Sequence, residues 1–146
     1  MKKAETSIVI DAPAEKVWQV LTDFGHFKEW NPIIRSLKGK TEEGAQLEAH
    51  LALNESDKIM KFRPVVLKSE RNREFRWLGK LGFKGLFDGE HYFILKPLSD
   101  GKTHFIHGEQ FSGLLVRFLS NMLRELPAGF MRMNEALKNR VENGGI

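Results

Sequence analysis

Between Ile33 and Ser112 the chain consists of short segments with period-two alternation, and no helical pattern interrupts them. The expected strands cover residues 33–39, 45–53, 58–70, 73–79, 89–97 and 102–112, and turn-forming residues at 41–44, 54–57, 71–72 and 99–101 separate several of them. Consecutive strands with short links pair antiparallel, because parallel pairing needs a crossover of a dozen or more residues. The sequence therefore predicts an antiparallel meander and excludes a parallel α/β fold.

Helical patterns lie on both sides of this meander. Residues 6–11 are β-branched and short, which indicates a first strand, and Pro13 then precedes an amphipathic pattern. The apolar positions of that pattern and of a second short helical turn are Val17, Val20, Leu21, Phe24, Phe27 and Trp30. We therefore expect two short helices after the first strand.

Apolar residues recur every three or four positions from Leu115 to Val141, which predicts a long amphipathic helix. Pro127 falls inside this pattern, where it removes a backbone hydrogen bond and clashes with the preceding turn. We therefore expect a kink or break near residues 123–126. A sheet with one face to bury and one long helix to cover it predicts an α+β fold in which the sheet curves around the helix.

Composition limits the function classes. The 146 residues suit a single domain over 1–146, and the absence of Cys excludes disulfides, thiolate metal sites and Cys nucleophiles. The net charge of +4 comes from scattered basic residues, so we expect no nucleic-acid partner. The first residues lack the apolar stretch of a signal peptide, and no run approaches the ~20 apolar residues of a membrane helix. These features predict a cytoplasmic protein without an integral membrane segment, of undefined oligomeric state.

Four segments carry a family resemblance. They are Ile8-Val9-Ile10-Asp11-Ala12-Pro13-Ala14-Glu15-Lys16-Val17-Trp18-Gln19-Val20-Leu21-Thr22-Asp23-Phe24, Trp30-Asn31-Pro32, Gly101-Lys102-Thr103 with Glu109-Gln110-Phe111-Ser112-Gly113-Leu114-Leu115, and Met133-Asn134-Glu135-Ala136-Leu137-Lys138. Together they resemble the polyketide cyclase/dehydrase and lipid-transport branch of the START-like (SRPBCC, Bet v 1-like) superfamily over essentially the whole chain. The resemblance implies a helix-grip fold, with a curved antiparallel sheet of about seven strands around the C-terminal helix. It also implies a deep apolar cavity between them, but it supplies no catalytic residues.

The aromatic composition suits such a cavity. Eleven Phe and three Trp stand against one Tyr, and Phe favours dry surroundings. The expected ligand-contacting residues are Trp30, Leu51, Met60, Phe62, Phe75, Trp77, Phe87, His91, Phe93, Phe105, His107, Glu109, Phe111, Phe118, Met122, Leu126 and Phe130. We expect no metal and no cofactor. Glycines at 79, 82, 85 and 89 alternate with Leu and Phe, which indicates either a turn packed over the core or a mobile flap at the cavity mouth.

Polar residues within this set are the candidate chemistry. His107 and Glu109 share one face of the last strand, because side chains alternate every two residues. A three-residue link at 99–101 sets His91 opposite Glu109, whereas a two-residue link pairs Tyr92 with Glu109 and turns His91 outward. We favour the first register, in which His91, His107 and Glu109 converge. The convergence is compatible with a buried hydrogen-bonded cluster, with ligand recognition, or with acid–base chemistry or a two-His, one-carboxylate metal site.

Three functions follow from these features. The preferred one is non-covalent binding of a hydrophobic small molecule, such as a lipid, a polyketide-like compound or an isoprenoid. The second is a cyclase/dehydrase-type enzyme in which His107 or Glu109 moves protons. The third is an interaction protein similar to a chaperone co-activator, which would use its surface and not its cavity.

Overall fold

The structure, a computed structural model, describes residues 2–52 and 58–144. The elements in chain order are β1 (Lys2–Ile10), α1 (Ala14–Thr22), η1 (Phe24–His26), α2 (Phe27–Trp30), β2 (Ile34–Lys38), β3 (Glu48–Ala52), β4 (Ile59–Phe62), β5 (Val65–Glu70), β6 (Glu74–Leu81), β7 (Phe87–Pro97), β8 (Thr103–Ser112), η2 (Val116–Phe118) and α3 (Ser120–Glu142). The two η elements are single turns of 3₁₀ helix. The turn expected at 54–57 lies outside the described residues.

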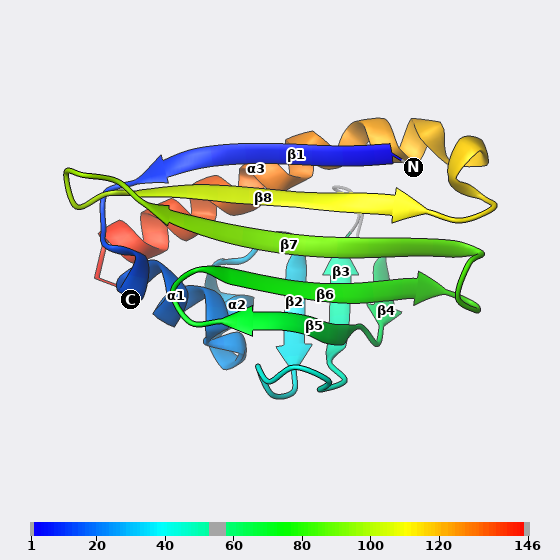
Figure 1. The fold of residues 1–146 in the computed structure, drawn as a ribbon, viewed down its shortest axis with the longest axis horizontal. Helices are drawn as coiled ribbons and strands as arrows, with labels where there is room; N and C mark the ends of the chain where they lie inside the picture. Colours follow the sequence, from blue (N-terminus) through cyan, green and yellow to red (C-terminus); the bar gives the residue numbers. More distant parts are fainter. Residues whose placement is uncertain (1, 53–57, 145–146) are drawn as a thin grey trace.

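The strands form a curved antiparallel sheet in two hydrogen-bonded sections (Figure 1). One section has the order β1-β8-β7-β6-β5, and the other has the order β2-β3-β4. A bridge between Gln46 and Val65 joins them, together with the hydrogen bond that the Leu47 amide donates to the Pro64 carbonyl at 2.7 Å. The long helix α3 runs behind the sheet (Figure 1). This arrangement confirms the helix-grip fold.

The segment 58–70 and the first strand differ from the expectation. The segment 58–70 is two strands, β4 and β5, which belong to different sections of the sheet. The interruption lies at Pro64, which has no backbone N–H to donate to a ladder. The first strand begins at Lys2 instead of Thr6, because its opening residues pair with the end of β8 as far as Phe111. The described residues thus contain eight strands where about seven were expected.

Of the kink or break expected near residues 123–126, the break does not occur, because α3 is continuous through Pro127. The chain departs from α-helix at Leu119 instead, between η2 and α3. Proline removes one hydrogen bond, but most helical stability in a protein comes from packing of the apolar face. That face is buried along the helix after the proline, at Phe130, Met133, Leu137 and Val141.

The space between the sheet and α3 is filled at the end where α1 packs. Phe75, Phe93 and Phe105 are fully buried there, and Phe75 contacts the rings of Trp18 and Phe24 at centroid distances of 6.1 and 5.8 Å. A second, smaller apolar cluster lies toward the other end and includes Phe111, Val116, Leu123 and Phe130. The solid core is therefore at the α1 end of the fold, and the room for a cavity lies between the two clusters.

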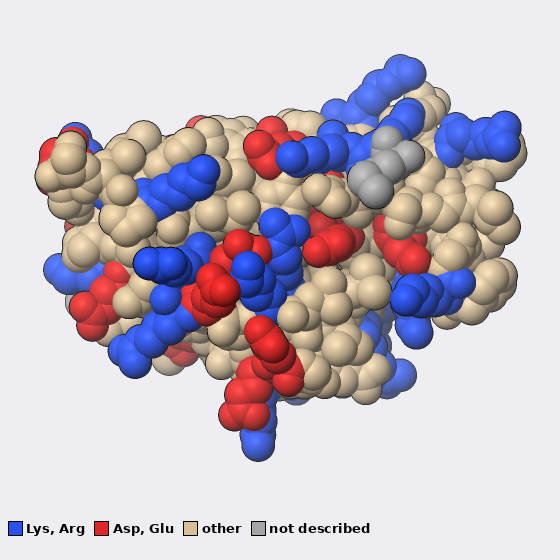
Figure 2. Space-filling view, in the orientation of Figure 1, with Lys and Arg blue, Asp and Glu red and all other residues tan. Residues whose placement is uncertain are grey.

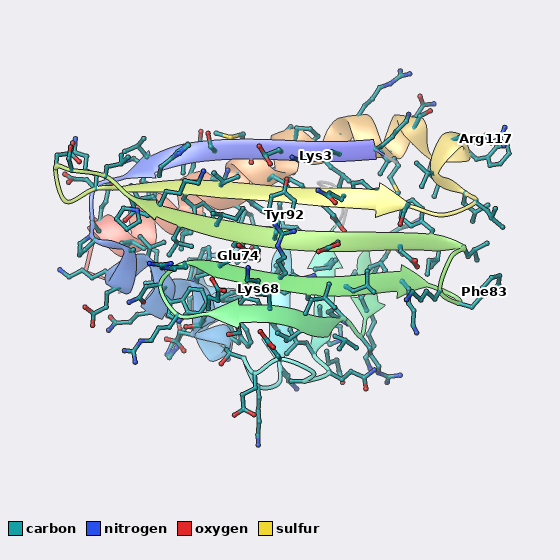
Figure 3. All side chains as sticks on the ribbon, in the orientation of Figure 1. Lys3, Lys68, Glu74, Phe83, Tyr92 and Arg117 are labelled. Atoms are coloured by element: carbon teal, nitrogen blue, oxygen red, sulfur yellow. The ribbon has the colours of Figure 1, made fainter. Side chains whose placement is uncertain are left out.

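The one tyrosine lies on the opposite, convex side of the sheet (Figure 3). Tyr92 donates a hydrogen bond to Glu5, and the Arg76 guanidinium lies 4.7 Å from the centre of its ring. Burial, followed by the hydrogen bond to Glu5, raises the pKa of Tyr92 above its ordinary value. Its ring covers Gly108, where a Cβ atom would lie 2.5 Å from the tyrosine Cζ. The polar aromatic residue Tyr92 thus packs on the convex side of the sheet, and phenylalanines line the concave side.

Truncation of Phe105 should destabilise the fold without opening the ligand site. Phe105→Ala removes a fully buried ring from the solid core, which costs about 3–5 kcal/mol of unfolding free energy. Urea unfolding monitored by tryptophan fluorescence measures this loss. Ile106→Ala, on the other face of β8, is the control and should cost clearly less, so equal losses would contradict the placement of the core.

Candidate functional site

A cavity of about 210 Å³ lies between the concave face of the sheet and α3. This volume is many times the ~10–15 Å³ that one water needs. The predicted ligand-contacting residues that line it are Leu51, Met60, Phe62, Trp77, Phe87, His91, His107, Glu109, Phe111, Met122, Leu126 and Phe130. The structure therefore brings most of the predicted site together around one hollow, with mainly apolar walls.

Five predicted residues do not line the cavity. Phe75, Phe93 and Phe105 lie in the solid core, because α1 and its neighbours cover that part of the concave face. Trp30 packs on Phe27 at a centroid distance of 5.1 Å, away from the hollow. Phe118 is 74% exposed on η2, since the chain enters α3 only after Leu119 and the extrapolated helical stripe does not apply before it.

Two glycines expected at the ends of the strands 73–79 and 89–97 lie inside longer strands and shape the cavity. Gly79 in β6 and Gly89 in β7 lie opposite one another. A Cβ atom at Gly89 would lie 2.2 Å from Glu109 Oε2, so the missing side chain makes room for this carboxylate. A Cβ atom at Gly79 would meet only the Gly89 carbonyl oxygen, at 3.9 Å. The glycine spacing was visible in the sequence, but its meaning depends on the strand pairing.

The link between these strands is shorter than expected. Of the two phenylalanines expected in it, only one contacts the cavity. β6 ends at Leu81 and β7 begins at Phe87. Phe87 lines the cavity and stacks on Phe111 at a centroid distance of 5.6 Å. Phe83 is 64% exposed. The inward side chain is thus the one on the strand, and the one on the link faces solvent.

The β7–β8 hairpin has the favoured register. His91 pairs with Glu109, and Phe93 pairs with His107. The Leu98 amide donates to the Lys102 carbonyl at 2.8 Å, which leaves a three-residue link at 99–101, and Gly101 has the left-handed φ of +81° that this link needs. The predicted convergence of the two histidines and the carboxylate is confirmed.

These side chains form one hydrogen-bonded chain across β7, β8, α3 and β1. Nδ1 of His91 lies 3.3 Å from Oε1 of Glu109, and its Nε2 lies 2.7 Å from Nε2 of His107. Nδ1 of His107 lies 2.8 Å from Oδ1 of Asn134. The Asn134 amide donates to the Thr6 hydroxyl at 2.9 Å, and this hydroxyl donates to the backbone carbonyl of His107 at 3.0 Å. Each of these polar side chains, from α3 to the cavity wall, therefore has a hydrogen-bonding partner.

Aromatic rings enclose both imidazoles. His107 is fully buried and stacks on Phe130 at a centroid distance of 4.3 Å, and His91 stacks on Trp77 at 5.0 Å. Burial and the neighbouring His91 lower the pKa of His107 well below its ordinary value, against the opposing effect of hydrogen bonds to Asn134 and the Phe130 backbone. His107 is therefore neutral at pH 7.

The donor and acceptor roles along these hydrogen bonds determine which atoms carry the protons. The Thr6 hydroxyl donates its own proton to the His107 carbonyl, so it accepts the hydrogen bond from the Asn134 NH2 group. The amide oxygen of Asn134 therefore faces His107, and Nδ1 of His107 carries the proton between them. Neutral His107 accepts at Nε2, so Nε2 of His91 is the donor. The contact between His91 Nδ1 and Glu109 needs one more proton, on the ring or on the carboxyl group. The chain thus places one shared proton at the cavity wall.

Asn134 and Thr6 are the members of this hydrogen-bonded chain that the sequence analysis missed. Asn134 is fully buried and follows Met133 on the face of α3 that packs against the sheet. A polar residue on a buried helical face was the available signal, because a buried amide needs a hydrogen-bonding partner. Its partner could not be identified from the sequence, since β1, β8 and α3 meet only in the folded chain.

The metal-site interpretation finds no support in the geometry. Among residues 2–52 and 58–144, no group of three His, Cys, Asp or Glu residues is arranged to hold a metal ion. Nδ1 of His107 is hydrogen-bonded to Asn134, and the Nε2 atoms of the two histidines face one another at hydrogen-bonding distance.

No helix within residues 2–52 and 58–144 is long and apolar enough to cross a membrane.

A family model described as polyketide cyclase / dehydrase and lipid transport matches residues 1–142. The chain belongs to this family. Its fold resembles the Zhui aromatase/cyclase from Streptomyces sp. R1128, with 15% identity, 99% of both chains covered and a TM-score of 0.77. It also resembles a START superfamily protein from Mycobacterium smegmatis, with 19% identity, 97% of both chains covered and a TM-score of 0.74.

A third similar structure is a norcoclaurine synthase point mutant from Thalictrum flavum in complex with a transition-state analogue, with 11% identity and a TM-score of 0.74. The match covers 97% of this chain and 94% of that one. No curated protein matches the sequence. At these identities the structural neighbours show a shared fold, and the family model shows membership.

The buried, neutral His107 should make stability depend on pH. Its folded-state pKa is lower than its unfolded value, so only the unfolded chain takes up this proton as the pH falls. The contribution is complete above about pH 6.5 and decreases below it, by up to ~1.4 kcal/mol per pH unit. Between pH 7.5 and 5.5, urea unfolding should show a loss about 1.4 kcal/mol larger in the wild type than in His107→Gln.

The comparison with His107→Gln separates this effect from other titrating groups. The hydrogen bond that the exposed His26 donates to the Asp23 carboxylate raises the pKa of this histidine, which contributes with the opposite sign in the same pH range. That contribution is common to both proteins and cancels in the difference. Equal pH dependence in the two proteins would show that His107 takes up a proton in the folded state.

Proposed function

We propose that this protein binds a largely apolar small molecule, of the lipid, polyketide-like or isoprenoid class, in the cavity between the sheet and α3. The observation that carries the proposal is the cavity of about 210 Å³ with mainly apolar walls and the hydrogen-bonded side chains Glu109, His91 and His107 on one side. Ligand sites commonly combine apolar walls with a few fixed polar groups. The family description of cyclase/dehydrase and lipid transport supports the same class of ligand.

The arrangement of the walls suggests how such a ligand lies. Trp77, Phe62 and Leu126 supply apolar surface from β6, β4 and α3, and each Å² buried contributes ~25 cal/mol. The polar end of the ligand points to Glu109, because this carboxylate is one of the few polar groups on the cavity wall. In this proposal the ligand contacts come from the cavity-lining members of the predicted set, without Trp30, Phe75, Phe93, Phe105 and Phe118.

Filling the cavity should abolish binding of a neutral apolar probe. N-phenyl-1-naphthylamine fluoresces strongly when it leaves water, so its titration into the protein measures occupancy. Gly79→Leu adds a side chain that points into the hollow from a position with no close neighbour, and Gly79 has no left-handed φ that would oppose it. We expect at least a tenfold loss of affinity, equivalent to ~1.4 kcal/mol.

Gly25→Leu is the matched control, since Gly25 is exposed and a Cβ atom there meets nothing within 4 Å. It adds the same side chain outside the cavity and should bind the probe like the wild type. Thermal unfolding of both variants establishes that they are folded. Unchanged probe affinity in folded Gly79→Leu would refute binding in this cavity.

The shared proton favours a second candidate function, acid–base chemistry on a bound carbonyl compound. With the proton on His91, Glu109 is a carboxylate at the cavity wall and can accept a proton from the carbon next to a carbonyl group. The C–H electron pair then moves to the carbonyl oxygen as an enolate, and return of the proton from Glu109 restores the ketone. His107 has the positioning role in this scheme, because both of its ring nitrogens are already hydrogen-bonded.

Exchange of the acidic hydrogens of 2-tetralone in D₂O tests this chemistry. Nuclear magnetic resonance follows deuterium incorporation next to the carbonyl group. The wild type should accelerate exchange, and Glu109→Gln should lose about 10²–10⁴-fold of the acceleration. The control is Glu90→Gln, which alters a carboxylate on the other face of β7 that pairs with Arg76. Equal exchange with wild type and Glu109→Gln, while probe binding persists, would leave a binding protein without this activity.

A further inference from the structure

Large apolar side chains are exposed at one end of the molecule. We call Leu81, Phe83, Leu114, Phe118 and Met122 the end patch. Phe118, Leu114 and Phe83 are 74%, 73% and 64% exposed. Leu81 and Met122 are exposed as well. Exposed apolar groups that gather in this way mark a surface that meets a partner or a membrane.

Two segments that are far apart in sequence are held together here by their backbones. The Leu114 amide donates to the Gly85 carbonyl at 3.0 Å, and the Leu115 amide donates to the Leu86 carbonyl at 3.0 Å. Gly113 has a φ of +116°, and a Cβ atom there would lie 2.6 Å from the Leu86 carbonyl oxygen. This close approach places the β6–β7 link beside the chain that leads into α3. The exposed residues of the two segments therefore form one surface.

Basic residues flank this surface. Lys80, Lys84, Arg117 and Arg124 lie on the same segments, and none of them has an ion pair in the described part of the chain. Figure 2 shows blue side chains around tan surface at the right-hand end of the molecule, and Figure 3 shows Phe83 and Arg117 projecting from that end.

Two acidic residues on the same segments offset only part of this charge. Asp88 is buried, and its carboxylate accepts the Gly85 amide. Glu125 is the other acid on these segments; it is exposed at the cavity wall and makes no ion pair with the four cations. The combination of protruding apolar side chains with unpaired cations is complementary to an anionic lipid surface, whose headgroups attract Lys and Arg and whose acyl boundary accepts apolar groups.

We propose that the end patch docks the protein on bilayers that contain anionic phospholipids. Phe83, Leu114 and Phe118 enter the boundary between headgroups and acyl chains, while Arg117 and Arg124 contact lipid phosphates. Charge complementarity selects this occupant over a second copy of the chain, because two copies joined through this patch would bring their cations together. The docking is independent of what the cavity holds.

The position of the end patch relative to the cavity gives the docking a consequence. Leu81 and Met122 belong to the patch and also line the cavity. A bilayer in contact with the patch is therefore adjacent to the cavity wall. An apolar molecule could pass between the bilayer and the protein while little of its surface is exposed to bulk water.

Vesicle co-flotation tests the docking with the intact protein. Vesicles of phosphatidylcholine alone are compared with vesicles of equal parts phosphatidylcholine and phosphatidylglycerol. The wild type should bind the anionic vesicles, bind the neutral ones much less, and dissociate as salt screens the charges. Arg117→Gln with Arg124→Gln should weaken binding roughly 25-fold, about fivefold for each cation. Phe83→Ser with Phe118→Ser should weaken it at least tenfold.

Matched controls change the same kinds of residue elsewhere. Leu98→Ser alters an exposed side chain on the β7–β8 link at the other end of the molecule, and Lys16→Gln with Lys40→Gln removes the same net charge from α1 and the β2–β3 link. Both should bind vesicles like the wild type. N-phenyl-1-naphthylamine binding should persist in all variants, which separates docking from occupancy of the cavity.

Three results would overturn the proposal. One is that folded wild type does not float with the anionic vesicles. Another is that the control variants lose as much binding as the end-patch variants, which would reduce the effect to net charge. The third is that the wild type self-associates in sedimentation velocity, that Phe118→Ser abolishes this, and that vesicles do not compete with it.

Discussion

The register of the β7–β8 hairpin is the constraint on which the site depends. It sets His91 beside Glu109 and Phe93 beside His107 on the concave face. A shift of one residue in either strand would turn that strand's whole inward set outward, because strand side chains alternate between the two faces. The three-residue link with Gly101 in the left-handed region holds this register. Three link residues thus determine the chemistry of a cavity wall that lies far from them along the hairpin.

The same concave face is a solid core at one end and a cavity at the other. At the α1 end, the rings of Phe75, Phe93 and Phe105 meet Trp18 and its neighbours and leave no room. Toward the other end, Gly79 and Gly89 have no side chains to fill the concave face, and the carboxylate of Glu109 occupies part of the space that they leave. The cavity results from missing side chains in β6 and β7 as much as from the curvature of the sheet.

Satisfied polar contacts allow two histidines to lie in these surroundings. A buried polar group without a partner would cost about 1–3 kcal/mol, and each step from Thr6 through Asn134 to His107 has one. Asn134 and Thr6 fix the direction of this hydrogen-bonded chain, which ends at the contact between His91 and Glu109 on the cavity wall. A network that holds α3 against β1 and β8 thereby presents a proton donor or acceptor to the cavity.

The meander, the helices around it, the shared face of His107 and Glu109, and the favoured register could be predicted from the sequence, because these depend on periodicity and turn chemistry within short segments. Which inward residues face solid core or hollow depends on tertiary packing, since α1 covers one end of the sheet from elsewhere in the chain. Tertiary packing also decided that Asn134 and Thr6 complete the histidine chain, that α3 continues through Pro127, and that Phe118 faces solvent. These outcomes depend on packing between distant segments, which no local pattern encodes.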